Sequence, residues 1–110
     1  MKMVIAIIRP EQLPSVRQAL FAAEFRNMTV ISLQGTAPKS EQQKYRGVAR
    51  EVSLFHRVRI ELAVTDEKVE SAIEAISEGA KETGGWGRIF VTPLEEAVTI
   101  WTGDRGEDSL

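Results

Sequence analysis

The order of six apolar patterns limits what this chain can fold into more than any other feature. Residues 4–8 are almost continuously apolar and rich in β-branched side chains, which predicts a strand buried in a sheet, and Pro10 ends it. Residues 13–25 then place apolar side chains at helical spacing, with Pro14 in the tolerated first turn. Residues 28–33 predict a second strand.

The rest of the chain predicts three further elements. Within residues 52–64 apolar side chains alternate with charged ones, as in a strand with one buried face. Asp66 is a favourable N-cap for a helix over about 66–80, whose apolar residues recur at helical spacing. Glycines should end this helix, residues 88–91 predict a fourth strand, and residues 97–101 are expected to continue extended.

This order, βαββαβ, is that of the ferredoxin-like split βαβ in the α+β class. The fold has a four-stranded antiparallel sheet with two helices on one face. The 110 residues are expected to form one domain, residues 1–110. The other face of the sheet needs a cover, so assembly with further subunits is expected.

The composition excludes several functions. A formal net charge of −2 gives no electrostatic reason to bind nucleic acid. With no cysteine and one histidine, neither a disulfide framework nor a cysteine nucleophile is possible, and no metal site or prosthetic group is expected. The apolar N-terminus is too short for a signal peptide or a membrane span, which predicts a cytoplasmic protein.

A glycine cluster at residues 84–87 runs into Arg88 and an apolar strand. Such a cluster lets backbone amides approach an anion closely, while the cation meets its charge. The spacing fits neither the Walker loop nor the dinucleotide fingerprint, and an ordinary glycine-rich turn is the alternative. Residues 36–51 form a polar connection of unusual length, which is typical of a functional or disordered loop.

Short motifs follow one another at regular spacing along almost the whole chain. They are Met1-Lys2 with Ala6-Ile7-Ile8-Arg9-Pro10, Leu13 with Val16-Arg17 and Ala19-Leu20, Asn27-Met28-Thr29-Val30, Gly35, Tyr45-Arg46-Gly47, Gly87-Arg88-Ile89-Phe90-Val91 with Pro93, and Thr102-Gly103-Asp104-Arg105-Gly106-Glu107-Asp108. In these motifs the chain resembles the PII family of nitrogen-regulatory signalling proteins. The resemblance implies a homotrimer with an adenine nucleotide in each cleft between subunits, acting as a regulator and not as an enzyme.

The resemblance also implies roles for three segments. A T-loop at about 36–54 would contact a partner protein, such as a membrane transporter or a metabolic enzyme. A glycine-rich B-loop at about 82–88 would bind phosphate, and a C-terminal segment at about 99–110 would close the neighbour's cleft. Ligand binding would set the shape of the T-loop, and this shape would decide which partner is engaged.

Positions that match the family's motifs supply the candidate site residues. Those for nucleotide binding are Thr29, Gly35, Gly85, Gly87, Arg88, Thr102 and Gly103. Candidates for a small anionic effector are Arg57 and Lys39, and the partner-binding loop would use Tyr45, Arg46, Gly47 and Arg50. The alternative for Arg57 is a solvated or interface position on its strand.

Departures from the family pattern change the expected effectors. Arg50 stands where many bacterial members carry a uridylylated tyrosine, so uridylylation is not expected. Residues 37–41 replace the Gly-Arg-Gln-Lys-Gly run that helps to hold Mg²⁺ and 2-oxoglutarate, so 2-oxoglutarate is not expected either. Bicarbonate is the candidate anion instead, as in PII-like proteins linked to inorganic carbon.

The nucleotide cleft departs from the pattern as well. Trp86 and Arg88 stand where the family has aspartate and a phosphate-binding lysine, and Thr99 and Trp101 replace two arginines that reach the phosphates. Each charge-assisted phosphate contact contributes roughly 1.5–3 kcal/mol of binding free energy, so the affinity for a triphosphate should fall most. ADP or AMP is therefore expected in preference to ATP.

Two other functions stay open from the sequence. The first is a trimeric scaffold whose T-loop plugs a transporter independently of nucleotide, which the loss of the two cleft arginines favours. The second is a small ferredoxin-like enzyme, since this fold also hosts catalysts. No pair of base and nucleophile can be identified for the second.

Overall fold

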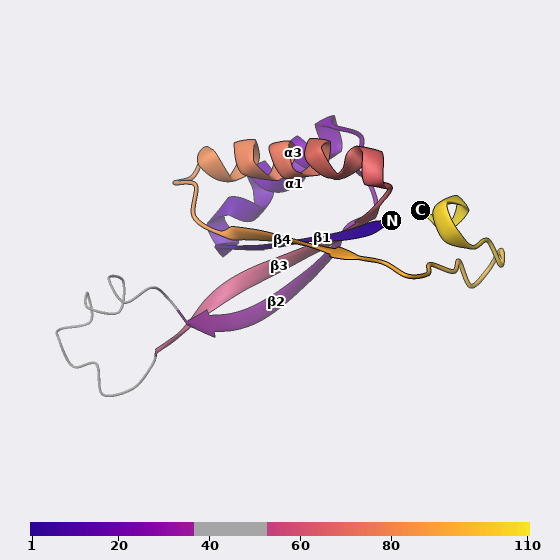
Figure 1. Cartoon of the computed structure of the whole chain (residues 1–110). Helices are drawn as coiled ribbons and strands as arrows, with labels where there is room; N and C mark the ends of the chain where they lie inside the picture. The colour runs from indigo at the N-terminus through magenta and orange to yellow at the C-terminus, as the bar shows by residue number, and fades with distance from the viewer. Residues whose placement is uncertain (37–52) are drawn as a thin grey trace.

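The structure, a computed structural model, describes residues 1–36 and 53–110 (Figure 1). Its strands are β1 (Lys2–Ile8), β2 (Thr29–Thr36), β3 (Leu54–Val64) and β4 (Arg88–Pro93), and its helices are α1 (Leu13–Ala22) and α3 (Val69–Lys81). Short 3-10 turns lie at Pro10–Gln12, Asp66–Lys68 and Gly106–Ser109. The predicted βαββαβ order of the α+β class is confirmed.

The four strands form one antiparallel sheet in the order β2-β3-β1-β4. Both helices cover the same face of this sheet (Figure 1). The two central strands are β3 and β1, so β2 and β4 are the edges. This arrangement confirms the ferredoxin-like fold that the sequence predicts.

The core lies between the sheet and the helices, and it follows the period of each element. Every second residue of β1 and β3 points to the helices, and each helix turns an apolar stripe toward them. The buried residues of these four elements are Val4, Ala6, Ile8, Val16, Leu20, Val58, Ile60, Leu62, Val64, Ala72, Ala75, Ile76 and Ala80. Burying one large aliphatic side chain of this kind contributes about 1.5–3 kcal/mol.

Gly79 lets the two helices approach each other closely. A Cβ at this position would lie 2.7 Å from the Val16 Cα and 2.8 Å from the Ser15 carbonyl oxygen. The Ser15 hydroxyl also donates a hydrogen bond to the Gly79 carbonyl at 2.7 Å. The distance between α1 and α3 is therefore set by backbone contact at a glycine.

The prediction that Asp66 caps the second helix was wrong. A 3-10 turn separates it from α3, which begins at Val69, and Asp66 makes no side-chain hydrogen bond to a cap amide. Its carboxylate instead accepts a hydrogen bond from the Met1 ammonium at 2.9 Å and lies 3.7 Å from the Lys2 Nζ. The hydrogen bond from the ammonium, followed by the charge of Lys2, lowers the pKa of Asp66.

Two further boundaries differ from the sequence prediction. Helix α1 ends at Ala22, and Glu24 then adopts a positive φ of 68° that turns the chain. Residues 97–101 do not stay extended, because Val98 pairs with Arg105 in an isolated bridge and the chain turns between them. The C-terminal residues thus form a small hairpin that projects beyond the end of the sheet (Figure 1).

The sheet face opposite the helices carries apolar side chains without a cover among the described residues. Ile31 on β2 is 40% exposed and Phe90 on β4 is 48% exposed. Between these edges, Arg59 and Glu61 of β3 form an ion pair at 2.7 Å. An apolar face of this kind is typical of a surface that is buried on association.

We predict that Gly79→Ala destabilises the fold. Alanine favours a helix over glycine by about 1 kcal/mol, but overpacking against a neighbouring backbone costs about 1–3 kcal/mol. Here the cost of overpacking should exceed the gain in helix propensity. Chemical denaturation should show a lower free energy of unfolding for Gly79→Ala than for the matched exposed control Ser71→Ala. Equal stability of the two variants would contradict this reading of the helix contact.

Candidate functional site

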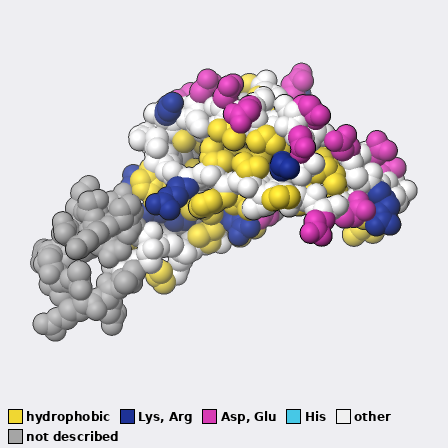
Figure 2. Space-filling model, in the orientation of Figure 1, with side chains coloured by type: hydrophobic (Ala, Val, Ile, Leu, Met, Phe, Trp, Pro, Cys, Tyr) yellow, Lys and Arg dark blue, Asp and Glu magenta, His cyan; other side chains and the backbone are white. Residues whose placement is uncertain are grey.

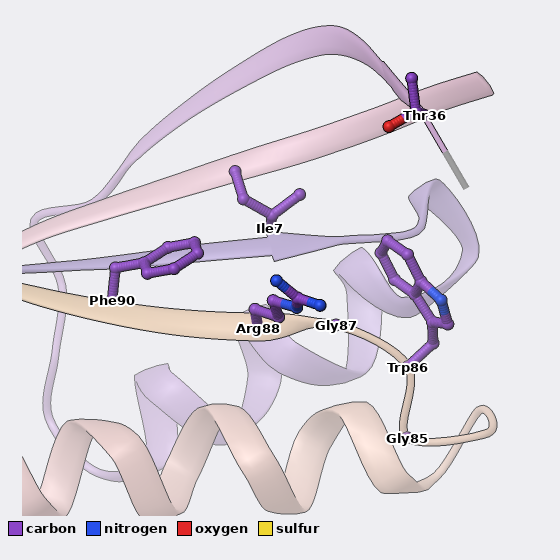
Figure 3. A pocket seen from close by; sticks show the side chains of 7 residues that line it. All are labelled: Ile7, Thr36, Gly85, Trp86, Gly87, Arg88 and Phe90. Carbon is purple, nitrogen blue, oxygen red and sulfur yellow. The ribbon is translucent and has the colours of Figure 1, made fainter. Parts of the chain in front are cut away.

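A pocket of about 640 Å³ opens beside the end of β1 and the start of β4. Its lining residues are Ile7, Thr36, Gly85, Trp86, Gly87, Arg88 and Phe90 (Figure 3). The volume lies in the range of small-molecule sites in proteins. Arg88 brings a guanidinium into this pocket from the first residue of β4, so the site joins apolar walls to one cation.

The backbone of the B-loop (residues 82–88) follows a path that requires glycine. The Gly85 N–H donates a hydrogen bond to the Ala80 carbonyl at 2.9 Å, which ties the loop to the end of α3. Gly85 and Gly87 adopt φ values of 69° and 133°, in the region that favours glycine. A Cβ on Gly87 would lie 2.6 Å from the Ile7 carbonyl oxygen. The loop is therefore held against the end of β1.

Gln12 links the end of β1 to the end of α3 from within the core. Its side chain is fully buried, and its Oε1 accepts a hydrogen bond from the Arg9 N–H at 2.8 Å. Its Nε2 donates to the Ala80 carbonyl at 3.3 Å. One buried amide thus links the end of β1 to the end of α3, where the B-loop starts, and a buried polar group with satisfied hydrogen bonds specifies this geometry.

Two arginines lie close to the ring of Trp86. The Arg57 guanidinium is 4.3 Å from the centre of its ring, and the Arg9 guanidinium is 5.1 Å from it. Arg57 also lies 5.3 Å from the ring of Phe55, two residues earlier on the same face of β3. Phe55, Arg57, Trp86 and Arg9 therefore form a cation–π stack beside the pocket.

Arg57 is a buried cation in this stack. Its side chain is 6% exposed, and its Nη1 donates to the His56 carbonyl at 2.9 Å. Burial lowers the pKa of Arg57, and the charge of Arg9 lowers it further. Arginine nevertheless keeps its charge in proteins. The alternative of a solvated Arg57 is wrong for the isolated chain.

The predicted nucleotide residues fall into separate places within one chain. Gly85, Gly87 and Arg88 line the pocket, and Gly35 lies beside it, where an added Cβ would be 3.7 Å from the Arg57 Cγ. Thr29 lies at the far end of β2, in a shallow depression beside Glu61. Thr102 and Gly103 belong to the C-terminal hairpin. The predicted residues Lys39, Tyr45, Arg46, Gly47 and Arg50 lie outside the described residues.

The C-terminal hairpin is held together by its own polar groups. Glu96 accepts hydrogen bonds from the N–H groups of Ala97 and Gly106 and forms an ion pair with Arg105 at 3.3 Å. These contacts, led by the Ala97 hydrogen bond, lower the pKa of Glu96. The Thr102 hydroxyl donates to the Asp104 carboxylate at 2.9 Å. These polar contacts hold the hairpin together, while its tip is exposed to solvent.

Two large apolar side chains at this tip point away from the body of the chain. Ile100 is 92% exposed and Trp101 is 87% exposed. Exposed apolar surface of this size usually marks a contact with another molecule.

Other kinds of site find little support in the described part of the chain. Within residues 1–36 and 53–110, no three His, Asp or Glu side chains gather as metal ligands would. No helix in these ranges has the length and hydropathy to cross a bilayer. A groove between α1 and β2 is lined by Leu13, Phe21 and Val30, among others, but it has no glycine-rich loop.

Sequence reasoning missed the pocket residues Ile7, Thr36 and Phe90 and the Arg9 contact with Trp86. Ile7 and Phe90 belong to neighbouring strands, and only the register of β1 and β4 brings them to one face. The sequence held one signal for the cation–π stack. Phe55 and Arg57 are two residues apart in the predicted strand, so their side chains share a face.

We predict that Gly87→Ala displaces the B-loop. The added methyl meets the Ile7 carbonyl and the positive φ disfavours any Cβ, so the loop should move away from β1. Trp86 fluorescence, recorded in a Trp101→Phe background, should shift relative to the parent protein. Gly84→Ala is a control with a positive φ but open space around its Cβ. An unchanged spectrum for Gly87→Ala would contradict the close contact between the B-loop and the Ile7 carbonyl.

Comparison with known proteins places this geometry in a family. Residues 1–104 match the family described as nitrogen regulatory protein P-II. The chain is 41% identical over 114 residues to the nitrogen regulatory protein GlnK1 of Methanosarcina mazei, covering all of this chain and 97% of that protein. It is 42% identical over 113 residues to the nitrogen regulatory protein P-II of Azospirillum brasilense, covering both chains completely.

These matches agree with the fold and with the resemblance in the sequence motifs. They also exclude the enzyme alternative, because proteins of this family regulate other proteins. The chain belongs to the P-II family of nitrogen regulatory signal-transduction proteins.

Proposed function

We propose that this protein senses an adenine nucleotide, ADP or AMP in preference to ATP, in the pocket beside the B-loop. The observation that carries the proposal is the meeting of Gly85, Gly87 and Arg88 at one pocket wall. A guanidinium binds phosphate through charge-assisted hydrogen bonds, and glycines let an anion approach the backbone of a loop closely. The Gly85 N–H already donates to the Ala80 carbonyl, so Arg88 would carry the phosphate contact. The apolar side chains of Ile7 and Phe90 offer surface for the nucleoside.

A trimer completes this site in the proposal. Thr29, Thr102 and Gly103 lie away from the pocket in one chain, so they reach a nucleotide only if a second subunit supplies them. The uncovered apolar face of the sheet and the exposed Trp101 provide surface for such contacts. Family membership supports the same assembly, since P-II proteins are trimers.

A small anion such as bicarbonate is the proposed second ligand. Three guanidiniums, those of Arg9, Arg57 and Arg88, lie around the B-loop, and their summed charge attracts anions to this end of the sheet. Acidic side chains instead gather over the helix layer and the C-terminal end (Figure 2). The distribution of charge therefore favours an anion at the B-loop end.

The output of the sensor in this proposal is a partner protein. Strands β2 and β3 lead into the segment proposed as the T-loop, residues 36–54, and Thr36 at its start lines the pocket. A ligand in the pocket would touch the first residue of this loop. The partner, a transporter or a metabolic enzyme, would then respond to the ligand through the loop.

We predict that Arg88→Ala weakens ADP and AMP binding about tenfold or more, since a charge-assisted phosphate contact is worth about 1.5–3 kcal/mol. Isothermal titration should show this loss relative to Arg17→Ala, a control that removes an exposed arginine from α1. ATP should bind the parent protein no more tightly than ADP. If ATP, ADP and AMP all fail to bind the parent protein, the nucleotide-independent scaffold is the better description.

We predict that Ile31→Asp disrupts the trimer. The cross-strand partner of Ile31 is Arg59, which already pairs with Glu61, so the new carboxylate would bring excess negative charge into the contact between subunits. Light scattering after gel filtration should give about three times the 12.2 kDa chain mass for the parent protein and for the control Ile31→Val. Ile31→Asp should shift toward the mass of one chain. A monomeric parent protein would refute the assembly.

A further inference from the structure

Trp101 and Arg88 are exposed groups that lie at opposite ends of the sheet. Trp101, at the tip of the C-terminal hairpin, is 87% exposed. Arg88 lines the pocket, and among residues 1–36 and 53–110 it has no ion pair or ring contact. Strand β4, six residues or about 20 Å long, lies between the B-loop and the hairpin (Figure 1). The two side chains therefore stay apart within one chain, and only a second copy can bring them together.

Backbone hydrogen bonds hold the turn that carries Trp101. The Thr99 N–H donates to the Asp104 carbonyl at 2.9 Å, and the Gly103 N–H donates to the Thr99 carbonyl at 2.8 Å. The residues between Thr99 and Gly103 thus form a turn that is closed by its own backbone. A side chain on an ordered turn loses less freedom on binding than one on a flexible segment. The exposed indole is therefore available for contact with another surface at a low entropic cost.

The charge of the hairpin is opposite to that of the pocket end. Residues 94–110 contain five carboxylates and one arginine, and Figure 2 shows acidic side chains at this end of the molecule. The guanidiniums of Arg9, Arg57 and Arg88 lie around the B-loop. Complementary charge favours an approach of the hairpin of one copy to the B-loop of the next. A head-to-tail contact of this kind closes into a ring when its rotation allows, as in a trimer.

Stacking on an aromatic ring occupies the face of a guanidinium and leaves its edge available for hydrogen bonds. Arg57 shows this geometry within the chain. It lies 4.3 Å from the centre of the Trp86 ring, while its Nη1 donates to the His56 carbonyl at 2.9 Å. Arg88 can likewise bind a phosphate through its edge while an indole covers one face. Lysine has no planar group that stacks in this way, although it keeps the charge.

We propose that Trp101 of a second subunit stacks on the Arg88 guanidinium and orients its edge toward the phosphate. The inference rests on the proposed function, in which Thr102 and Gly103 of a second subunit reach the nucleotide. Trp101 directly precedes Thr102, and consecutive Cα atoms lie about 3.8 Å apart, so the indole enters the same cleft. Trp101 is then a positioning residue, because it acts on the ligand through Arg88.

Fluorescence without nucleotide tests the contact itself. In Trp86→Phe the only remaining tryptophan is Trp101. Acrylamide should quench its emission several-fold less than it quenches N-acetyltryptophanamide, because a second subunit covers the indole. Arg88→Lys, in the same background, should raise the quenching. The matched control is Arg26→Lys, which removes a guanidinium that lies 4.4 Å from the Phe21 ring in the groove between α1 and β2.

Three results of the fluorescence test would overturn the proposal. Quenching equal to that of the free amide would show that no subunit covers Trp101. Reduced quenching that does not respond to Arg88→Lys would place the indole on another surface. A response to Arg26→Lys instead would place the hairpin tip in the groove between α1 and β2.

Calorimetric titration with ADP tests the positioning role. Trp101→Ala should weaken ADP binding about tenfold, whereas Trp101→Phe keeps an aromatic face and should stay within about threefold of the parent protein. In the Arg88→Lys background, Trp101→Ala should cause little further loss. An equal loss in both backgrounds would show that Trp101 does not act through Arg88, and it would overturn the proposal.

Mixed trimers show whether the two residues come from different subunits. Arg88→Ala and Trp101→Ala chains are coexpressed with different affinity tags and purified together. Some of their contacts join an intact Arg88 to an intact Trp101, so a fraction of sites should recover the parent affinity for ADP. No recovery would overturn the contact between subunits. If ADP does not bind the parent protein, the nucleotide sensor is contradicted, while the fluorescence test still decides whether Trp101 contacts Arg88.

Discussion

The contact between Gly87 and the Ile7 carbonyl is the constraint on which the site depends. Because this position has no Cβ, the B-loop lies directly on the end of β1 before it enters β4. Gln12 holds the same end of β1 to the end of α3 through two buried hydrogen bonds. Together these contacts direct Arg88 into the pocket and Trp86 onto Arg57.

A second feature of the site is that two positive charges, those of Arg9 and Arg57, lie close together beside Trp86. Burial and then the charge of Arg9 lower the pKa of Arg57, so the charged form of Arg57 is disfavoured here. Cation–π contacts with Trp86 and Phe55 offset part of this cost. In the proposed function, an anion bound at this end of the molecule would offset the same cost.

The sequence predicted the fold well, because its helices have clear apolar periods and its strands are apolar or alternate between apolar and polar residues. It failed where a polar contact overrides the local preference. Asp66 has the side chain of an N-cap, yet it binds the Met1 ammonium at the start of the neighbouring strand β1. Residues 97–101 have the composition of a strand, yet Arg105 and Glu96 fold them into a hairpin. The partner of Asp66 is distant in sequence, whereas Glu96 and Arg105 flank residues 97–101, and their contact depends on the turn between them.

The sequence by itself determined the βαββαβ order and the glycine-rich segment before Arg88, because periodicity and glycine requirements are local properties. Tertiary structure decided that Arg57 is buried, that Arg57 and Arg9 both lie close to the ring of Trp86, and that Ile7, Thr36 and Phe90 share a pocket with Arg88. These residues come from the four strands, the B-loop and Arg9, the residue that follows β1. Only strand register and the close approach at Gly87 bring them together, and neither is written in the spacing of the residues.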